Sequence, residues 1–316
     1  MARADGVDNP GKDKASKKVG ALFEKIDEQL RIQGVFELPL YSFYLGAPAI
    51  QGVAYLPSWA PRLGPRILWK DIGATVTFAL PVSDADERRR GNTQSTEVIL
   101  NRYWRQNAVD AYYLRDRGFY VTSPFRELSV HKPERYPQLP DAVVTNLGFN
   151  WYYVFNPDRY SLKAAFDQSE FQTQSGGSWL ASPFYNHLEM SLGDRFIGGV
   201  GDDSVTTMPN LAAGRFDTAG ASFGYGYAYI WGRFFASAIG ALGPGVEYQR
   251  VYPNDSGVKT NVNLAWKINV NVAMGFNYHD YVGGIKGLLD SLSSSVSGTE
   301  VASNLISGQL FFGARF

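Results

Sequence analysis

Hydrophobic and polar residues alternate with a period of two through most of this chain. Between residues 72 and 80, Ile, Ala, Val, Phe and Leu occupy every second position. The same alternation recurs at 143–155, 219–231 and 258–272, where aromatic and aliphatic side chains alternate with Gly, Ser, Asn and Lys. Because successive side chains of a strand point to opposite faces, this pattern predicts strands with one apolar and one polar face.

Further alternating runs bring the expected total to about 12 to 14 strands, in the size range of single-chain bacterial barrels. These runs lie at 36–45, 49–57, 64–69, 95–104, 107–121, 177–190, 233–250 and 305–316. The turn Asn156-Pro157-Asp158 leads into another strand expected over 160–166. Residues 257–281 fit one very long strand or two, because no Gly or Pro turn divides them near Lys267. Long connections are expected at 82–94, 123–142, 191–216 and 282–304.

The N-terminal region follows a different pattern. Residues 5–18 are polar and lysine-rich and contain Gly and Pro, which indicates a tail without a packed core. Ser16 can cap a short amphipathic helix, whose apolar residues recur at spacings of three or four: Val19, Leu22, Phe23, Ile26 and Leu30. We therefore expect two regions, a tail and helix over 1–33 and the barrel over 34–316. A helix packed at the periplasmic end is favoured over one that lies on the membrane, fills the lumen or mediates assembly.

Alternation alone does not separate a membrane barrel from a soluble β protein, since a soluble sheet also has one solvated face. The placement of the 20 Phe, 19 Tyr and 7 Trp favours the membrane, because rings crowd strand ends at 151–155 and 225–231. Such rings form girdles at lipid interfaces. The apolar faces also match the roughly 9 to 11 residues that a tilted strand needs to cross hydrocarbon. The expected fold is thus all-β, a transmembrane antiparallel β-barrel of a bacterial outer membrane.

The two ends of the chain carry further signals. Phe312 and Phe316 belong to an alternating final strand that stops on Phe316, which resembles the terminal signal recognised by outer-membrane assembly machinery. We expect that machinery as a partner during folding. Ala2-Arg3-Ala4 ahead of Asp5 resembles the end of a signal peptide, so we expect a mature exported form, with an ordinary cytoplasmic N-terminus as the alternative.

Composition narrows the functional classes. The chain has 30 basic and 30 acidic residues, so no overall positive charge points to nucleic acid. No apolar run of about 18 residues is present, which excludes a transmembrane helix. Zero Cys excludes disulfides and thiolate metal sites.

Residues 155–178 carry motifs specific enough to suggest a family. They are Phe155-Asn156, Tyr160-Ser161-Leu162, Ala164-Ala165-Phe166, Gln168-Ser169-Glu170, Gln172 and Ser175-Gly176-Gly177-Ser178, supported by Gly118-Phe119-Tyr120, Gly226-Tyr227-Ala228-Tyr229 and Leu242-Gly243-Pro244-Gly245. Together they resemble an uncharacterised outer-membrane barrel family, a domain of unknown function common in Bacteroidetes-type bacteria. The resemblance covers about residues 35–316 and implies fold and location, not mechanism.

Polar positions in the expected strands supply the candidate site residues. If the aromatic faces meet lipid, seven charged residues point into the lumen: Glu97, Asp110, Lys163, Asp167, Lys259, Lys267 and Arg315. They can line a wet lumen or tie it shut by salt bridges. Gln168, Glu170 and Gln172 are expected to form a polar clasp at the barrel rim, with a ligand or lipid-headgroup site as the alternative. The bare face at Gly220, Gly224 and Gly226 leaves space for water, the N-terminal helix or close strand packing.

Catalytic chemistry has little support. The three His, at 131, 187 and 279, have no metal-binding spacing, and no metal or other cofactor is expected. His187 lies on a strand without a recognisable Ser motif, so a membrane-embedded lipid hydrolase is the weakest hypothesis and we expect no enzyme and no catalytic residues.

Two functions remain from the sequence. The first is a porin-like passive channel for small hydrophilic solutes. The second is a structural or lipid-organising, self-assembling barrel with no open pore. Outer-membrane lipid and lipopolysaccharide are the expected partners, the latter a candidate for Arg88-Arg89-Arg90 if that loop is extracellular, and a homo-oligomer is left open.

Overall fold

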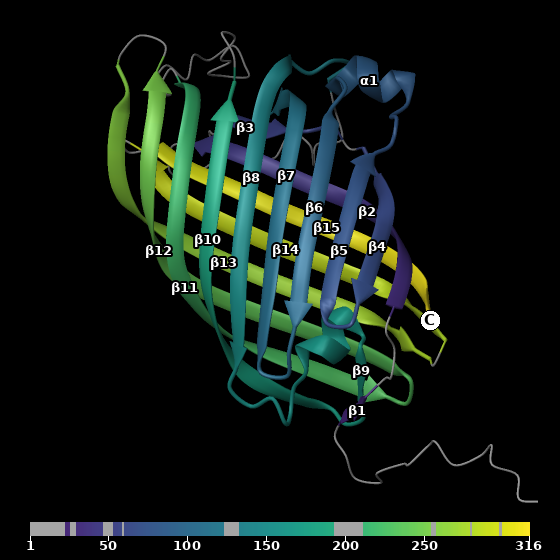
Figure 1. The fold of residues 1–316 in the computed structure, drawn as a ribbon. Helices are drawn as coiled ribbons and strands as arrows, with labels where there is room; N and C mark the ends of the chain where they lie inside the picture. The colour runs from purple at the N-terminus through teal and green to yellow at the C-terminus, as the bar shows by residue number, and fades with distance from the viewer. Residues whose placement is uncertain are drawn as a thin grey trace, which may run out of the picture.

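The computed structural model of the chain is an antiparallel β-barrel built from long strands (Figure 1). It describes residues 23–25, 30–46, 53–58, 60–122, 133–192, 211–253, 257–278, 280–296 and 299–316. Within these residues, thirteen strands form one sheet and two short strands form a second. The alternating sequence pattern therefore predicts the fold class correctly.

The strands of the large sheet follow the chain in order. The first are β2 (Leu30–Gly46), β3 (Val53–Leu56), β4 (Arg62–Trp69), β5 (Ile72–Ala79), β6 (Gln94–Tyr103), β7 (Asn107–Thr122) and β8 (Gln138–Val154). The others are β10 (Gly176–Ser191), β11 (Leu211–Trp231), β12 (Phe234–Pro253), β13 (Lys259–Asn277), β14 (Tyr281–Val296) and β15 (Thr299–Arg315). The small sheet pairs β1 (Phe23–Lys25) with β9 (Glu170–Gln172).

Two helical elements lie in connections between strands. Helix α1 (Asp84–Arg90) joins β5 to β6, and its N-cap residue Ser83 accepts a hydrogen bond from the Asp86 amide. Its acidic residues lie in the first turn and its basic residues in the last, which suits the helix dipole. A single π-helical turn, Lys163–Asp167, lies between β8 and β10. We call the end of the barrel that carries α1 the upper end and the opposite end the lower end (Figure 1).

The sheet closes on itself through β2 and β15. These strands pair antiparallel from Arg31 opposite Arg315 to Gly46 opposite Glu300. The ring runs through β2, β4, β5, β6, β7, β8, β10, β11, β12, β13, β14 and β15, twelve strands among the described residues. Closure pairs the backbone groups of every strand in the ring, as a strand in lipid requires.

Strand β2 changes its partner half-way along. Its lower part, as far as Glu37, pairs with β4, whereas Phe43–Leu45 pairs with β3. Strand β3 in turn pairs with Tyr120–Thr122 of β7. At the lower end the ring therefore passes through β4, β5 and β6, and at the upper end β3 alone joins β2 to β7.

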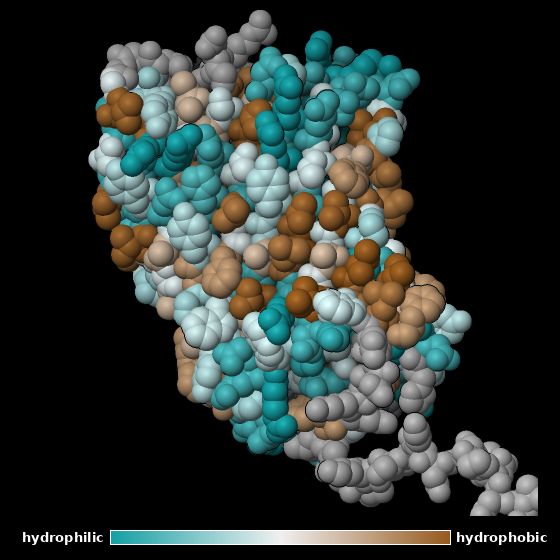
Figure 2. Space-filling model, in the orientation of Figure 1, coloured by the Kyte–Doolittle hydropathy of each residue, from teal (hydrophilic) through white to brown (hydrophobic). Residues whose placement is uncertain are grey.

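Large apolar side chains are exposed on the outer face of the barrel. They include Leu63 and Ile67 on β4, Trp151 on β8, Tyr225 on β11 and Leu264 on β13. Figure 2 shows a brown band across the middle of one face, with pale and teal residues above and below it. This is the distribution that a lipid-facing barrel wall requires.

Among the described residues, no helix has both the length and the apolarity needed to cross a membrane.

Three expectations about individual segments differ from the structure. Phe23–Lys25, placed in the amphipathic helix, forms strand β1, and β2 already begins at Leu30; the rest of that helix lies outside the described residues. Residues 160–166 form no strand, because the segment folds into the lumen around its π-helical turn. Residues 282–304, expected as a long connection, belong mainly to β14 and β15, and the outer face of β14 is unusually rich in Ser and Gly. The ambiguous region 257–281 is one long strand, β13, followed by the start of β14.

Candidate functional site: the barrel lumen

The upper part of the lumen contains an apolar layer, bordered by buried polar side chains such as Glu97, Asp116 and Gln249. Inward-facing side chains from opposite walls pack together there, including Phe43 of β2, Leu114 of β7, Leu188 of β10 and Phe216 of β11. Tyr55 of β3 joins them from the short strand that closes the upper end. All five residues are almost fully buried, so this layer is a packed core and not a wet passage.

The middle of the lumen is polar and contains a cavity of about 110 Å³. Arg66, Asp110, Lys286 and Asp290 are among the residues that line it. Asp110 accepts a hydrogen bond of 2.7 Å from the Tyr103 hydroxyl. The carboxylate of Asp290 lies 3.0 Å from Lys267 Nζ, and both side chains are buried. These contacts join side chains of neighbouring strands, β6 with β7 and β13 with β14, around a space large enough for a few ordered waters.

The lower part of the lumen is filled by residues 155–175, which we call the plug loop. Its residues Tyr160, Leu162 and Phe166 pack against inward-facing side chains such as Tyr152 of β8 and Phe235 of β12. The Tyr160 hydroxyl lies 2.9 Å from Ser237 Oγ on β12. Figure 1 shows this loop in teal at the lower end, inside the ring of strands.

Four basic side chains hold the plug loop at the end of its π-helical turn. Arg31 donates to the Asp167 carbonyl, and Lys286 and Arg66 donate to the Phe166 carbonyl, Arg66 at 3.5 Å. Arg315 donates to the Gln168 carbonyl at 2.9 Å.

These four cations contact backbone carbonyls and a carboxylate. The carbonyls at the C-terminal end of a helical turn carry partial negative charge, which favours nearby cations. The buried Asp167 carboxylate adds a full negative charge, 3.7 Å from Arg66 Nη2. Chain segments far apart in the sequence are joined at this one place.

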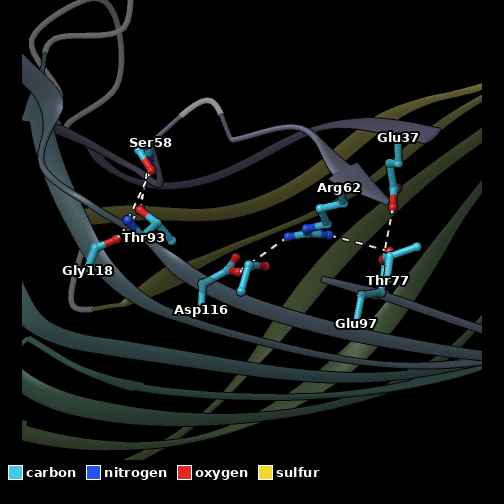
Figure 3. Close-up of polar contacts among 9 residues, drawn as sticks. Glu37, Ser58, Arg62, Thr77, Thr93, Glu97, Asp116 and Gly118 are labelled. Carbon is cyan, nitrogen blue, oxygen red and sulfur yellow. Dashed lines mark hydrogen bonds and ion pairs between the residues drawn. The ribbon is translucent and has the colours of Figure 1, made fainter. Parts of the chain in front are cut away.

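A second buried charge network lies where β2 leaves β4 (Figure 3). Arg62 is 3.4 Å from Glu97 and 3.3 Å from Asp116. The Thr77 hydroxyl lies between two carboxylates, 3.1 Å from Glu97 and 3.5 Å from Glu37. Buried charges are tolerated when they are paired and hydrogen-bonded, and this network fixes β2, β4, β5, β6 and β7 to one another.

The connection from β3 to β4 is held above this network. Ser58 N donates to Thr93 Oγ1 at 2.7 Å, Thr93 N donates to Ser58 Oγ at 3.0 Å, and Thr93 Oγ1 donates to the Gly118 carbonyl at 2.7 Å (Figure 3). Gly118 lies at a β-bulge with φ of +92°, and a Cβ there would lie 2.3 Å from the Asn92 carbonyl oxygen. Only glycine fits this position without strain.

The seven lumen candidates have different positions. Glu97, Asp167 and Lys267 are buried in the interior, Asp110 lines the cavity, and Arg315 holds the plug loop at the lower rim. Lys163 differs from its prediction, because it lies in the π-helical turn, where its Nζ is 2.7 Å from Asp71 in the turn between β4 and β5. Lys259 is also different: it is exposed at the upper end of β13, beyond the packed lumen.

The residues of the expected clasp interact within the plug loop itself. Glu170 accepts a hydrogen bond from the Ser161 hydroxyl, and Gln172 Oε1 accepts one of 3.2 Å from the Ser161 amide. Gln172 Nε2 donates to the carbonyls of Arg159 and Gln174 at 3.2 and 2.8 Å. Gln168 adopts a left-handed backbone conformation at the end of the π-helical turn. These contacts stabilise the loop, and Glu170 and Gln172 also line a small cavity of about 20 Å³ beside β11 and β12.

Several buried charges were absent from the sequence candidates. Arg31, Glu37, Arg62, Arg66 and Lys286 all point inward. A signal existed on β4, where Arg62 and Arg66 alternate with Leu63 and Ile67. In β2 the same parity places Arg31, Gln33 and Glu37 on the face opposite Ile32 and Phe36. Extending the alternation to charged residues in these strands would have found them.

His187 lies on the outer face of β10, not in the lumen. Its Nδ1 is 2.7 Å from Asp217 Oδ1, and its Nε2 is 4.0 Å from Glu189. In the part of the chain that the structure describes, no Ser or Thr hydroxyl donates to this ring, and no group of three or more His, Asp or Glu is arranged to hold a metal ion. His131 and His279 lie outside the described residues.

Comparison with known proteins identifies a family but no activity. Residues 37–316 match the family described as domain of unknown function DUF4421. The expected resemblance to an uncharacterised family is thus confirmed. No curated protein matches the chain.

Similar solved structures include three outer-membrane or transport proteins. The outer membrane protease OmpT from Escherichia coli is 8% identical, with a TM-score of 0.42 over 91% of this chain and 97% of that chain. The Pseudomonas putida toluene transporter TodX is 9% identical, with a TM-score of 0.26 over 91% and 90%. An anion-selective porin from Comamonas acidovorans is 12% identical, with a TM-score of 0.17 over 92% and 100%. Likeness at this level assigns no activity to the chain.

Proposed function

The chain belongs to the DUF4421 family, and from its barrel we propose that it is a bacterial outer-membrane protein with no open pore. The packed lumen carries this proposal. The apolar layer, the polar layer and the plug loop follow one another from the upper to the lower end. The protein then acts through its outer surface, by contact with lipid or with other proteins of the membrane.

The lengths of the connections support an orientation in the membrane. Apart from the plug loop, lower-end turns are short, as at 104–106 between β6 and β7 and 232–233 between β11 and β12. Most upper-end connections are longer, as at 80–93 and 192–210, although 297–298 between β14 and β15 has two residues. Bacterial barrels have short periplasmic turns and longer extracellular loops, so we assign the upper end to the extracellular side.

The non-conducting barrel is the better supported of the two functions expected from the sequence. A passive channel for hydrophilic solutes needs a continuous wet path, whereas the apolar layer excludes water at one end and the plug loop fills the other. The polar residues of the lumen here pair with one another, as in the Lys267–Asp290 ion pair between the neighbouring strands β13 and β14. Self-assembly in the membrane remains part of the proposal.

Conductance in a planar bilayer tests the proposal. The full-length protein, refolded and shown to be inserted by protease protection, is expected to give no stable current steps. A variant in which a Gly-Ser linker replaces residues 157–174 is expected to stay silent too, because the apolar layer remains. Steps from the full-length protein would overturn the proposal, and steps from the linker variant alone would instead indicate a channel gated by the plug loop.

We also propose that His187 has no catalytic role. The residue shares Asp217 with the Tyr185 hydroxyl, 2.7 Å from the same carboxylate oxygen, and this arrangement suits a polar cluster on the wall. Phospholipid hydrolysis by the wild type that is lost in His187→Ala would contradict this view. Equal or absent activity in both proteins would support it.

A further inference from the structure

Three successive rows on the outer wall change from apolar to charged toward the upper end. The first row contains Ala111, Phe149, Tyr185, Ala219, Val246 and Leu264. The second contains Tyr113, Leu147, His187, Asp217, Tyr248 and Val262. The third contains Arg115, Thr145, Glu189, Arg215, Arg250 and Thr260. Each row crosses β7, β8, β10, β11, β12 and β13, and the change in polarity places lipid headgroups beside the third row.

The third row contains two arginines directly opposite each other. Arg215 of β11 and Arg250 of β12 are cross-strand neighbours on the same face. Like charges in this position destabilise a sheet unless a counter-charge lies nearby. Arg215 has one, because its Nε and Nη2 donate to Glu189 Oε1 at 3.1 and 2.8 Å.

Arg250 differs from its neighbour. Its guanidinium stacks on the Tyr248 ring at 5.2 Å and donates to the Tyr248 hydroxyl at 3.3 Å. Within the described residues it makes no ion pair. The nearby acid in the second row, Asp217, is occupied by the Tyr185 hydroxyl and His187. Of the two arginines, only Arg215 has a carboxylate in direct contact, and both lie directly above an apolar wall.

We propose that the phosphate of an anionic outer-leaflet lipid binds between Arg215 and Arg250. Guanidinium groups match phosphate oxygens with two parallel hydrogen bonds, and the lipid phosphate would relieve the repulsion between the two arginines. The acyl chains of the same lipid would lie along Val246 and Leu264 in the apolar row. A lipid, not a free anion, is the occupant because phosphate and apolar contacts lie next to each other on the outer wall. The inference rests on the proposed membrane location and on the assigned orientation.

Native mass spectrometry of the full-length protein in detergent tests the site, with lipid A as the anionic probe and phosphatidylcholine as the zwitterionic one. The wild type is expected to retain lipid A selectively. Arg215→Gln with Arg250→Gln is expected to bind lipid A about 30-fold more weakly, equivalent to about 2 kcal/mol for two basic residues at an anionic surface. Arg215→Lys with Arg250→Lys, which keeps the charge, should retain most of the binding.

The matched control is Arg117→Gln with Arg135→Gln, which removes the same charge at the same end. Arg135 is exposed in the connection between β7 and β8, and Arg117 of β7 is paired with Asp141 at 2.9 Å, three strands around the ring from Arg215. This control is expected to bind lipid A like the wild type. If the double Gln variant does not fold, Arg250→Gln alone serves, with an expected loss of about fivefold.

Three results would overturn the inference: unchanged binding in the Gln variants, equal loss in the control, or displacement of lipid A by inorganic phosphate at the same concentration. These results are independent of bilayer conductance. A protein that gives no current and does not bind lipid A would refute the lipid site but support the proposed function. A protein that conducts and binds lipid A would support the lipid site but refute the proposed function.

Discussion

Gly226 shows how the absence of one side chain on a strand leaves space in the lumen for another segment. Along β11 the sequence predicts a bare inner face, open to water, a helix or close packing. The structure places Tyr160 of the plug loop there, and a Cβ on Gly226 would lie 2.6 Å from the Tyr160 ring. The space was predictable from the glycine, but its occupant was not, because the pattern along one strand does not specify which distant segment packs against it.

Gly226→Ala is therefore expected to destabilise the barrel by about 1–3 kcal/mol, the usual effect of an extra group in a packed interior. The control is Gly240→Ala on β12, where a Cβ would meet no atom within 4 Å. Urea unfolding in detergent, followed by tryptophan fluorescence, measures both. Equal midpoints for the two variants would show that Tyr160 does not occupy this space.

The plug loop shows where the sequence pattern fails at the scale of an element. Its apolar residues alternate over 160–166 as in a strand, yet a short apolar run also fits a buried helical turn. Long-range contacts decide between them, because Arg66 and Lys286 hold the Phe166 carbonyl from sites 100 and 120 residues away. The sequence did identify this loop as distinctive, since most of its family motifs lie here, but it did not show that the loop folds inward.

Removing the buried acid of the loop should loosen it. Asp167→Ala leaves the surrounding cations without their carboxylate, so faster amide hydrogen exchange is expected at residues 163–168. Asp71→Ala removes the partner of Lys163 at a half-exposed ion pair, which contributes little, and exchange there should change little. Exchange that is unchanged in Asp167→Ala would mean that the carbonyl contacts and apolar packing hold the loop without the carboxylate.

For the whole molecule, the sequence predicts more about the wall than about the interior. Wall positions follow the alternation of apolar and polar residues that lipid outside the barrel requires. The number of strands and the closure of the barrel could therefore be predicted from the sequence. Interior contacts join residues far apart in the chain, as Arg62 and Asp116 do, and no local pattern encodes them. A strand was expected at 49–57, where β3 lies, but its pairing with both β2 and β7 was missed for the same reason.

Phe312 lies on β15, the strand that closes the barrel, and Phe316 directly follows it, so both bear on assembly of the whole molecule. Their side chains are 59% and 72% exposed, so replacing both with Ala should leave the refolded protein nearly as stable as the wild type. If they act as the assembly signal, the amount inserted in the outer membrane of cells should fall several-fold. Val262→Ala with Leu264→Ala, also on the outer wall, is the control. Normal insertion of the Phe variant would remove the proposed role in assembly.

The seam between β2 and β15 brings Arg31 directly opposite Arg315, and both grip carbonyls of the plug loop. Two cations that repel each other do not favour pairing of β2 with β15 at this position unless an acceptor lies between them. We therefore expect this end of the seam to close most readily once the plug loop supplies its carbonyls and Asp167 between the two arginines. The loop would then couple closure of the first and last strands to the folding of the middle of the chain.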